Sequence, residues 1–144
     1  MSKTEQKKVI AKMLKERPPS FKMLCDGMRE IYRWSGKAKP CDFILLKEHI
    51  WRVAWAVRRQ HGVHLYLAAT FHDCEEIYTS DIPSPIKALF PTVRAFGTAL
   101  RKEIFKRINI PWPTRAEWKL ITEADLADRD AEIKHLTENH LWLK

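Results

Sequence analysis

Apolar residues recur at helical spacing along almost the whole chain, and no segment keeps the alternation of a half-buried strand. Proline and glycine, which end helices, separate the apolar runs. The pattern predicts helices over residues 4–15, 21–34, 43–60, 64–78, 92–108 and 115–136, a short helix that starts at Ser84-Pro85 and ends before Pro91, and loops over 35–40, 79–85 and 111–113. The 144 residues are therefore expected to form one all-α domain, a compact helical bundle.

Two helix starts carry a capping signal. Ser20 is a suitable N-cap for the second predicted helix. Thr114, with Glu117 three residues later, matches a capping box at the start of the last one. The predicted helix over 64–78 is almost wholly apolar up to Phe71, so it is expected to be central and buried.

The formal net charge of +8 is unevenly distributed. Residues 1–39 carry 11 basic and 4 acidic side chains, whereas residues 116–144 carry 4 and 7. A basic N-terminal third favours an anionic partner, either nucleic acid or a phosphorylated small molecule, and is equally consistent with a solvated face.

Other sequence features limit the compartment. No apolar run approaches the roughly 18 residues of a membrane span, and the first residues lack the apolar region of a secretory signal. The three cysteines are far apart and show no CxxC spacing. We therefore expect a cytoplasmic protein with reduced thiols and no membrane partner.

The sharpest chemical feature is the segment Phe71-His72-Asp73-Cys74-Glu75-Glu76. At helical spacing, His72, Asp73 and Glu76 project from one face, after an apolar stretch where unpaired charge is costly. A bound divalent metal explains this combination. A core histidine paired with its neighbours is the alternative, and the His-Asp dipeptide alone favours it.

Two further residues strengthen the metal interpretation. His49 lies 13 residues before Gly62 and His72 lies 10 residues after it. If the two helices are antiparallel about Gly62, a rise of about 1.5 Å per residue brings the histidines within roughly 5 Å of the same level. Asp125 supplies a carboxylate beside the apolar face of the last helix, with Asp128 one turn further as the backup. Two imidazoles and two carboxylates suit one transition-metal ion with open positions.

The order His…His-Asp…Asp resembles the HD-domain phosphohydrolase superfamily. The block from His72 to Lys87, HDCEEIYTSDIPSPIK, resembles the HDxxE…D-[IL]-P-x-P-[IL]-K signature of YfbR-type 5′-deoxynucleotidases and phage DatZ-type dATP triphosphohydrolases. Arg33-Trp34-Ser35-Gly36 and Glu123-Ala124-Asp125-Leu126 resemble flanking segments of these groups, so the resemblance covers residues 21–136. The chain departs from the family around His49, which lies in Lys47-Glu48-His49-Ile50, and at Lys37, which replaces a usual histidine.

The resemblance implies a bundle of the HD-domain type and a set of site residues. The metal ligands would be His49, His72, Asp73 and Asp125, holding one divalent ion such as Zn, Co or Mn, with an additional Mg²⁺ when the substrate is a triphosphate. Glu76 would handle a proton, and Asp81 would be a second catalytic carboxylate near the leaving oxygen. The alternative for Asp81 is a loop residue that caps the turn before Pro83.

Four further residues are expected to bind the substrate, namely Arg33, Trp34, Lys37 and Lys87. Arg33 and the two lysines are candidate phosphate contacts, and Trp34 is a candidate for stacking on the base or sugar. Each has a structural alternative: an ion pair for Arg33, buried packing for Trp34 and a solvated position for the lysines.

The expected function is metal-dependent hydrolysis of deoxynucleotides at the phosphate next to the sugar. The products would be a deoxynucleoside plus phosphate or triphosphate, and the resemblance favours a phage enzyme, in the host cytoplasm, that acts on dATP or dAMP. The expected partners are a purine deoxynucleotide and further copies of the chain in a homo-oligomer, with no obligatory nucleic acid. Trp112 and Trp142 are the candidates for subunit contacts.

Two alternatives remain open from the sequence. A basic helical module that binds DNA or RNA without catalysis would show salt-sensitive binding and no metal dependence. The other alternative is a degenerate HD scaffold with a structural metal only.

Overall fold

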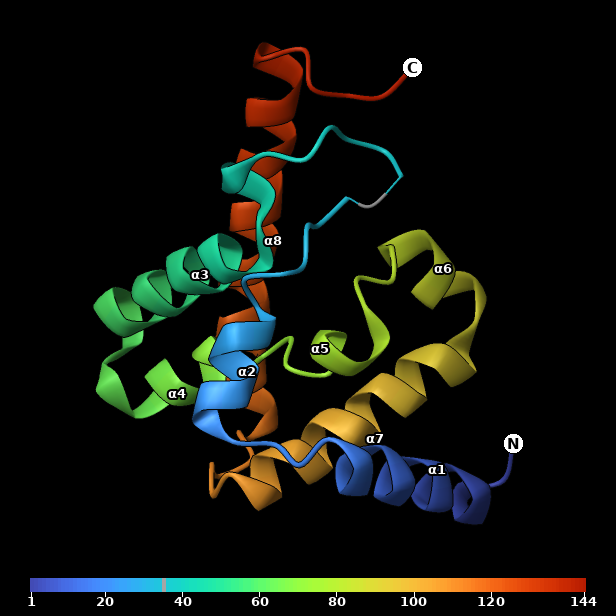
Figure 1. Cartoon of the computed structure of the whole chain (residues 1–144). Coiled ribbons are helices and arrows are strands. Elements are labelled where there is room, and N and C mark those ends of the chain that lie inside the picture. Colours follow the sequence, from blue (N-terminus) through green and yellow to red (C-terminus); the bar gives the residue numbers. More distant parts are fainter. Residues whose placement is uncertain (35) are drawn as a thin grey trace.

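The computed structural model describes residues 1–34 and 36–144, and within them the fold is all-helical, with no strand. The α-helices are α1 (Lys3–Glu16), α2 (Phe21–Gly27), α3 (Leu46–His61), α4 (Tyr66–Thr70), α5 (Glu76–Thr79), α6 (Ser84–Leu89), α7 (Pro91–Arg107) and α8 (Arg115–Glu138), with 3-10 helices η1 (Asp42–Ile44) and η2 (Val63–Leu65). The long α8 runs through the height of the molecule, α3 packs against α4 and α8, and α1 lies along α7 (Figure 1). The predicted all-α bundle is confirmed.

Several predicted elements match the structure closely, because proline, glycine and capping residues mark their ends. The helices over 4–15, 92–108 and 115–136 are confirmed within one or two residues as α1, α7 and α8. The side chain of Ser20 accepts the N–H of Met23 at 3.1 Å. The capping box at the start of α8 is also present, since the Thr114 and Glu117 side chains accept each other's backbone N–H groups.

The predicted helix over 21–34 is wrong beyond Gly27, where α2 ends. The chain then turns, and its backbone pairs with the segment before α3 instead of continuing the helix. The N–H of Arg33, for example, donates to the carbonyl of Ile44 at 2.8 Å. Apolar residues after Gly27 keep a helical spacing, but long-range backbone pairing fixes their conformation.

The helix predicted over 43–60 starts later than expected. Its first residues form η1, Leu45 is extended, and the regular helix begins at Leu46 as α3. At the other end, Gly62 adopts a φ of 93°, a left-handed conformation that favours glycine. The predicted break at Gly62 is therefore confirmed.

The helix predicted over 64–78 is wrong as a continuous element, because tight turns over residues 71–75 separate α4, which directly follows η2, from α5. The hydrogen bonds in these turns span three residues rather than four, as from the N–H of Cys74 to the carbonyl of Phe71 at 3.1 Å. The expected burial is confirmed, since Phe71 is only 2% exposed. The turn, and not a shared helical face, sets where the side chains after Phe71 point.

One large apolar cluster joins residues from all the longer helices, and a smaller one lies near the C-terminus. The smaller cluster holds the segment before α3 against the chain end, where the N–H of Lys39 donates to the carbonyl of Leu141 at 2.7 Å. Trp112 and Trp142, the candidate subunit contacts, both pack within the chain. The tryptophans that face outward are Trp51 and Trp55, whose rings stack 6.3 Å apart on α3.

Across residues 1–34 and 36–144, no helix combines the length and apolar character needed to cross a bilayer.

Candidate metal centre

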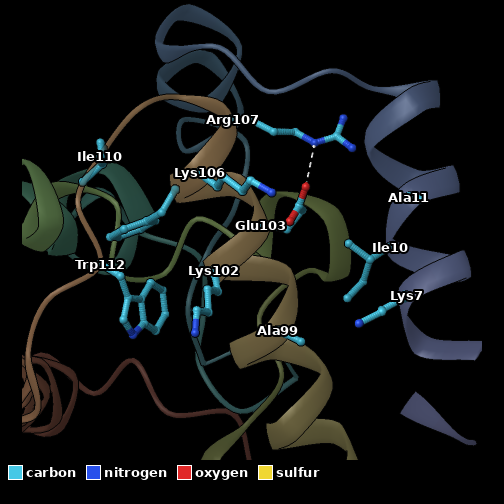
Figure 2. A pocket seen from close by; sticks show the side chains of 11 residues that line it. Lys7, Ile10, Ala11, Ala99, Lys102, Glu103, Lys106, Arg107, Ile110 and Trp112 are labelled. Carbon is cyan, nitrogen blue, oxygen red and sulfur yellow. Dashed lines mark hydrogen bonds and ion pairs between the residues drawn. The ribbon is translucent and has the colours of Figure 1, made fainter. Parts of the chain in front are cut away.

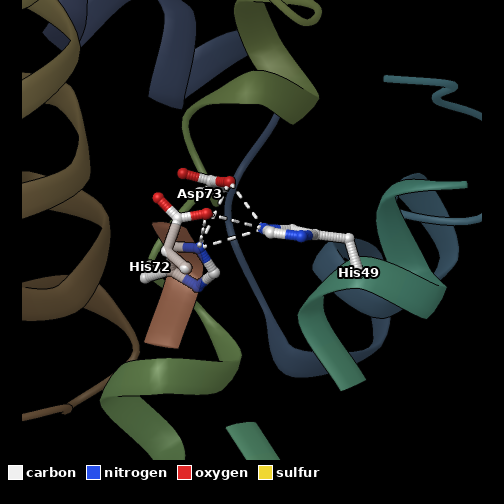
Figure 3. Close-up of side chains that lie close together, drawn as sticks. His49, His72 and Asp73 are labelled. Carbon is white, nitrogen blue, oxygen red and sulfur yellow. Dashed lines mark hydrogen bonds and ion pairs between the residues drawn. The ribbon is translucent and has the colours of Figure 1, made fainter. Parts of the chain in front are cut away.

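Four candidate ligands converge from three parts of the chain. His49 comes from α3, His72 and Asp73 from the turn after α4, and Asp125 from α8. One ligating atom of each lies within 4.8 Å of the others, and the histidines and Asp73 point toward a common centre (Figure 3). The structure thus brings together all four residues that the resemblance implies.

The distances within this cluster suit a single ion. The two Nε2 atoms lie 3.4 Å apart, so the predicted proximity of His49 and His72 is confirmed. Nε2 of His49 is 3.2 Å from Oδ1 of Asp125, and Nε2 of His72 is 3.3 Å from Oδ2 of Asp73. A tetrahedral ion with ligand bonds of about 2.1 Å spaces its ligand atoms about 3.4 Å apart. Imidazole with carboxylate is also a donor set that Zn, Co, Mn or Fe accepts.

The turn itself orients His72. The Nδ1–H group of its ring donates to the carbonyl of Ala69 at 2.7 Å, which leaves Nε2 to face the cluster. The side chain is buried, so the surrounding core keeps this orientation. This contact accounts for the histidine's placement without a continuous helix.

Burial and the neighbouring charges shift the protonation of the cluster strongly. Burial opposes the charge on His49, but hydrogen bonds with three aspartates outweigh it and raise the pKa of the imidazole to about 9. Burial also opposes the charge on His72, yet Asp73 and Asp125 raise its pKa well above the usual range. The histidines in turn outweigh burial and hold the pKa of both aspartates below the usual range. The carboxylates therefore require a compensating positive charge, which either protons or a divalent cation can supply.

Glu76 lies next to this cluster but outside the set of close ligand atoms. Oε1 accepts from Nζ of Lys87 at 3.3 Å, while Oε2 is buried and has no hydrogen-bond partner among the described residues. Burial, with the charge of Asp73 adding to it, raises the pKa of Glu76 well above its usual range. Burial thus favours the protonated form of this carboxyl group, whereas the contact with Lys87 opposes it.

A cavity of about 420 Å³ adjoins the cluster through Arg33. Its lining includes Arg33, Trp34, Lys37 and Asp81, three candidate substrate contacts and one candidate catalytic carboxylate. Arg33 donates to Oδ2 of Asp73 at 3.3 Å, so one guanidinium joins the cluster to the cavity wall. Lys87 does not line this cavity, since it contacts Glu76 and faces a smaller one.

The backbone at Trp34 is strained. Its φ of 62° lies in the left-handed region, which a bulky residue rarely adopts. Its N–H donates to Oδ2 of Asp81 at 2.9 Å and its indole Nε1–H donates to Oε2 of Glu132 at 2.7 Å. Two carboxylates therefore hold the Trp34 conformation at the cavity wall. Ser35, which belongs to the same predicted motif, lies outside the described residues.

A larger cavity, of about 740 Å³, lies between α1 and α7. Lys7, Lys102 and Trp112 are among its lining residues, and Arg107 pairs with Glu103 at its edge (Figure 2). None of the candidate catalytic, substrate or metal residues lines it. Its size alone therefore does not make it the functional site.

Sequence reasoning missed Glu132 and Arg52. Glu132 is fully buried on α8 and accepts from Arg33 at 3.1 Å, in addition to the indole of Trp34. Arg52 donates to Glu132 at 3.2 Å and to both carboxylate oxygens of Asp128. The available signal was the spacing of Glu132, four residues after Asp128 and seven after the candidate ligand Asp125, which places all three on one face of α8.

Comparison with family models, with curated proteins and with solved structures finds no match for this chain.

Proposed function

We propose that the protein is a metal-dependent phosphohydrolase that cleaves deoxynucleotides at the phosphate next to the sugar, with dATP or dAMP as the substrate. The observation that carries this proposal is the set of four close ligand atoms, two of them on buried histidines, next to a cavity whose lining includes cations. The products would be a deoxynucleoside plus phosphate or triphosphate. The choice of base and the phage origin follow from the motif resemblance alone.

His49, His72, Asp73 and Asp125 would hold one Zn, Co or Mn ion. The fit is supported by the donor types, by the burial of the two histidines and by the separations near 3.4 Å. When bound, such an ion supplies Lewis acidity and lowers the pKa of coordinated water. A triphosphate substrate would bring an additional Mg²⁺ ion.

Glu76 would act on a proton at Oε2, the oxygen that Lys87 does not contact. Burial raises the pKa of Glu76, and a carboxyl group in its protonated form can donate a proton to the departing 5′-oxygen of the nucleoside. Asp81 would lie beside that oxygen, and it also orients the backbone of Trp34. Lys87 acts in this arrangement by fixing the Glu76 side chain.

The cavity would bind the substrate with its phosphates toward Arg33 and Lys37 and its base against Trp34. A volume of about 420 Å³ lies within the range of small-molecule sites. The protein would act as a homo-oligomer, for which the outward-facing Trp51 and Trp55 are the candidate contacts.

The test is hydrolysis of a panel of deoxynucleoside mono- and triphosphates with Mn, Co, Zn or a chelator, with products resolved by chromatography. We expect metal-dependent release of a deoxynucleoside by the wild type and no release by His72→Ala or Asp73→Ala. His140→Ala, which changes an exposed histidine, is the matched control and should keep the activity. No turnover of any nucleotide by metal-loaded protein would contradict the proposal and favour the nucleic-acid-binding or degenerate-scaffold alternatives.

A further inference from the structure

Both ring nitrogens of His49 are engaged. Nε2 faces the candidate metal centre (Figure 3), whereas Nδ1 lies 2.8 Å from Oδ2 of Asp128. The imidazole is fully buried, so no solvent competes for either nitrogen. An ionised carboxylate can only accept a hydrogen bond, and Nδ1 must therefore carry the hydrogen of this contact. The nitrogen left to bind an ion is Nε2.

Asp128 is itself held in place by Arg52. The guanidinium donates from Nε to Oδ1 at 2.6 Å and from Nη2 to Oδ2 at 3.0 Å, a bidentate contact. Nη2 also donates to the carbonyl of Phe43 at 2.9 Å, and the guanidinium carbon lies 4.1 Å from the centre of the Phe43 ring. Arg52 therefore has few orientations open to it, and the same holds for the Asp128 carboxylate that it binds.

A second metal site that includes the Asp128 carboxylate is the alternative arrangement. Nδ1 of His49, Asp128 and Glu132 do offer ligand atoms within 4.8 Å of one another. However, Arg52 donates to both carboxylates, so a fixed positive charge already lies at that position. A cation there would have to displace the guanidinium, and the geometry favours the hydrogen-bonded arrangement.

We propose that Asp128, clamped by Arg52, is a positioning residue that keeps the hydrogen of His49 on Nδ1 and so presents Nε2 to the metal. This inference rests on the proposed metal centre and adds a role that the sequence did not assign, since Asp128 there was only a substitute ligand. A carboxylate that accepts the second ring N–H of a metal-binding histidine fixes the tautomer and ring orientation of that histidine. Its loss typically weakens metal binding by roughly 10- to 100-fold.

The experiment compares wild-type protein with Asp128→Ala and Asp128→Asn. Zn²⁺ affinity and stoichiometry are measured by competition with a chromophoric chelator, and the Nδ1–H resonance of His49 is observed by NMR. Asp130→Asn, which changes an exposed carboxylate on the same helix, is the matched control. Circular dichroism checks that each variant is folded, and the Asn variant retains the shape of the side chain if alanine is not tolerated.

We expect Asp128→Ala to bind one Zn²⁺ per chain with roughly 10- to 100-fold weaker affinity and to lose the exchange-protected Nδ1–H signal. Asp128→Asn should recover part of both, because its amide oxygen can still accept the hydrogen bond. Asp130→Asn should match the wild type. Affinity within threefold of the wild type in Asp128→Ala, or loss of a second bound ion, would overturn the positioning role. Failure of the wild type to bind Zn²⁺ would overturn the metal centre itself, whereas the NMR signal tests the Asp128 contact separately.

Discussion

Raising the pH should destabilise the metal-free protein, because its two candidate histidine ligands bind protons more tightly when folded. The pKa of His49 rises from its ordinary 6.5 to about 9 in the folded chain. The stabilisation that this provides is fully present below pH 6.5 and is lost as the pH rises through 9. The difference corresponds to about 3 kcal/mol. The raised pKa of His72 acts in the same direction.

The assay is urea unfolding in the presence of a chelator at several values between pH 6 and 9. We expect the free energy of unfolding to fall across this range in the wild type and in His140→Gln, in which only an exposed histidine is changed. The decrease should be clearly smaller in His49→Gln, which lacks the titrating group.

Zn²⁺ should reverse the sign of the effect. Metal ligands must be deprotonated, so the stabilisation that the ion provides increases with pH as protons cease to compete. A metal-free stability that stays constant or rises between pH 6.5 and 9 would refute the reasoning. So would an unchanged slope in His49→Gln.

Three substitutions test other parts of the structure by chemical denaturation. Gly27→Ala should destabilise by about 1–3 kcal/mol, although alanine favours helices, because its Cβ would lie 2.6 Å from Cγ2 of Ile77. The double variant with Ile77→Ala should show less than the summed loss, and a stabilising Gly27→Ala would contradict the packing. Glu132→Ala should cost about 3–5 kcal/mol because it removes a fully buried carboxylate that accepts from Arg33, Arg52 and the Trp34 indole, and a loss below about 1 kcal/mol would contradict this. Thr114→Ala should cost about 1 kcal/mol through loss of the capping box, and no change would show that the cap is unimportant.

Most of the fold followed from local signals. The limits of α1, α7 and α8 were predictable because proline, glycine or a capping box marks them in the sequence. The early end of α2 also had a local signal, Gly27, but the close approach of Ile77 to it is a tertiary contact. The break after α4 had no such marker, since neither proline nor glycine interrupts residues 64–78.

The candidate site likewise has features that the sequence predicts and features that depend on tertiary contacts. The proximity of His49 and His72 could be predicted from their spacing about Gly62, because helix geometry relates residue number to height. The network behind them could not, because Arg52 and Glu132 reach the site only through contacts between α3 and α8. The spacing of carboxylates along α8 showed which face they share, but not that an arginine would neutralise two of them.

The central claim is that His49, His72, Asp73 and Asp125 together bind one divalent transition metal ion. The most direct test is to load the metal-free protein with Zn, Co or Mn, remove unbound ions and measure the metal content per chain. We predict one ion per chain in the wild type and in Asp130→Ala, and none in His72→Ala or Asp125→Ala, provided that each variant is folded by circular dichroism. Wild-type protein that retains no ion, or folded ligand variants that retain as much as the wild type, would contradict the account.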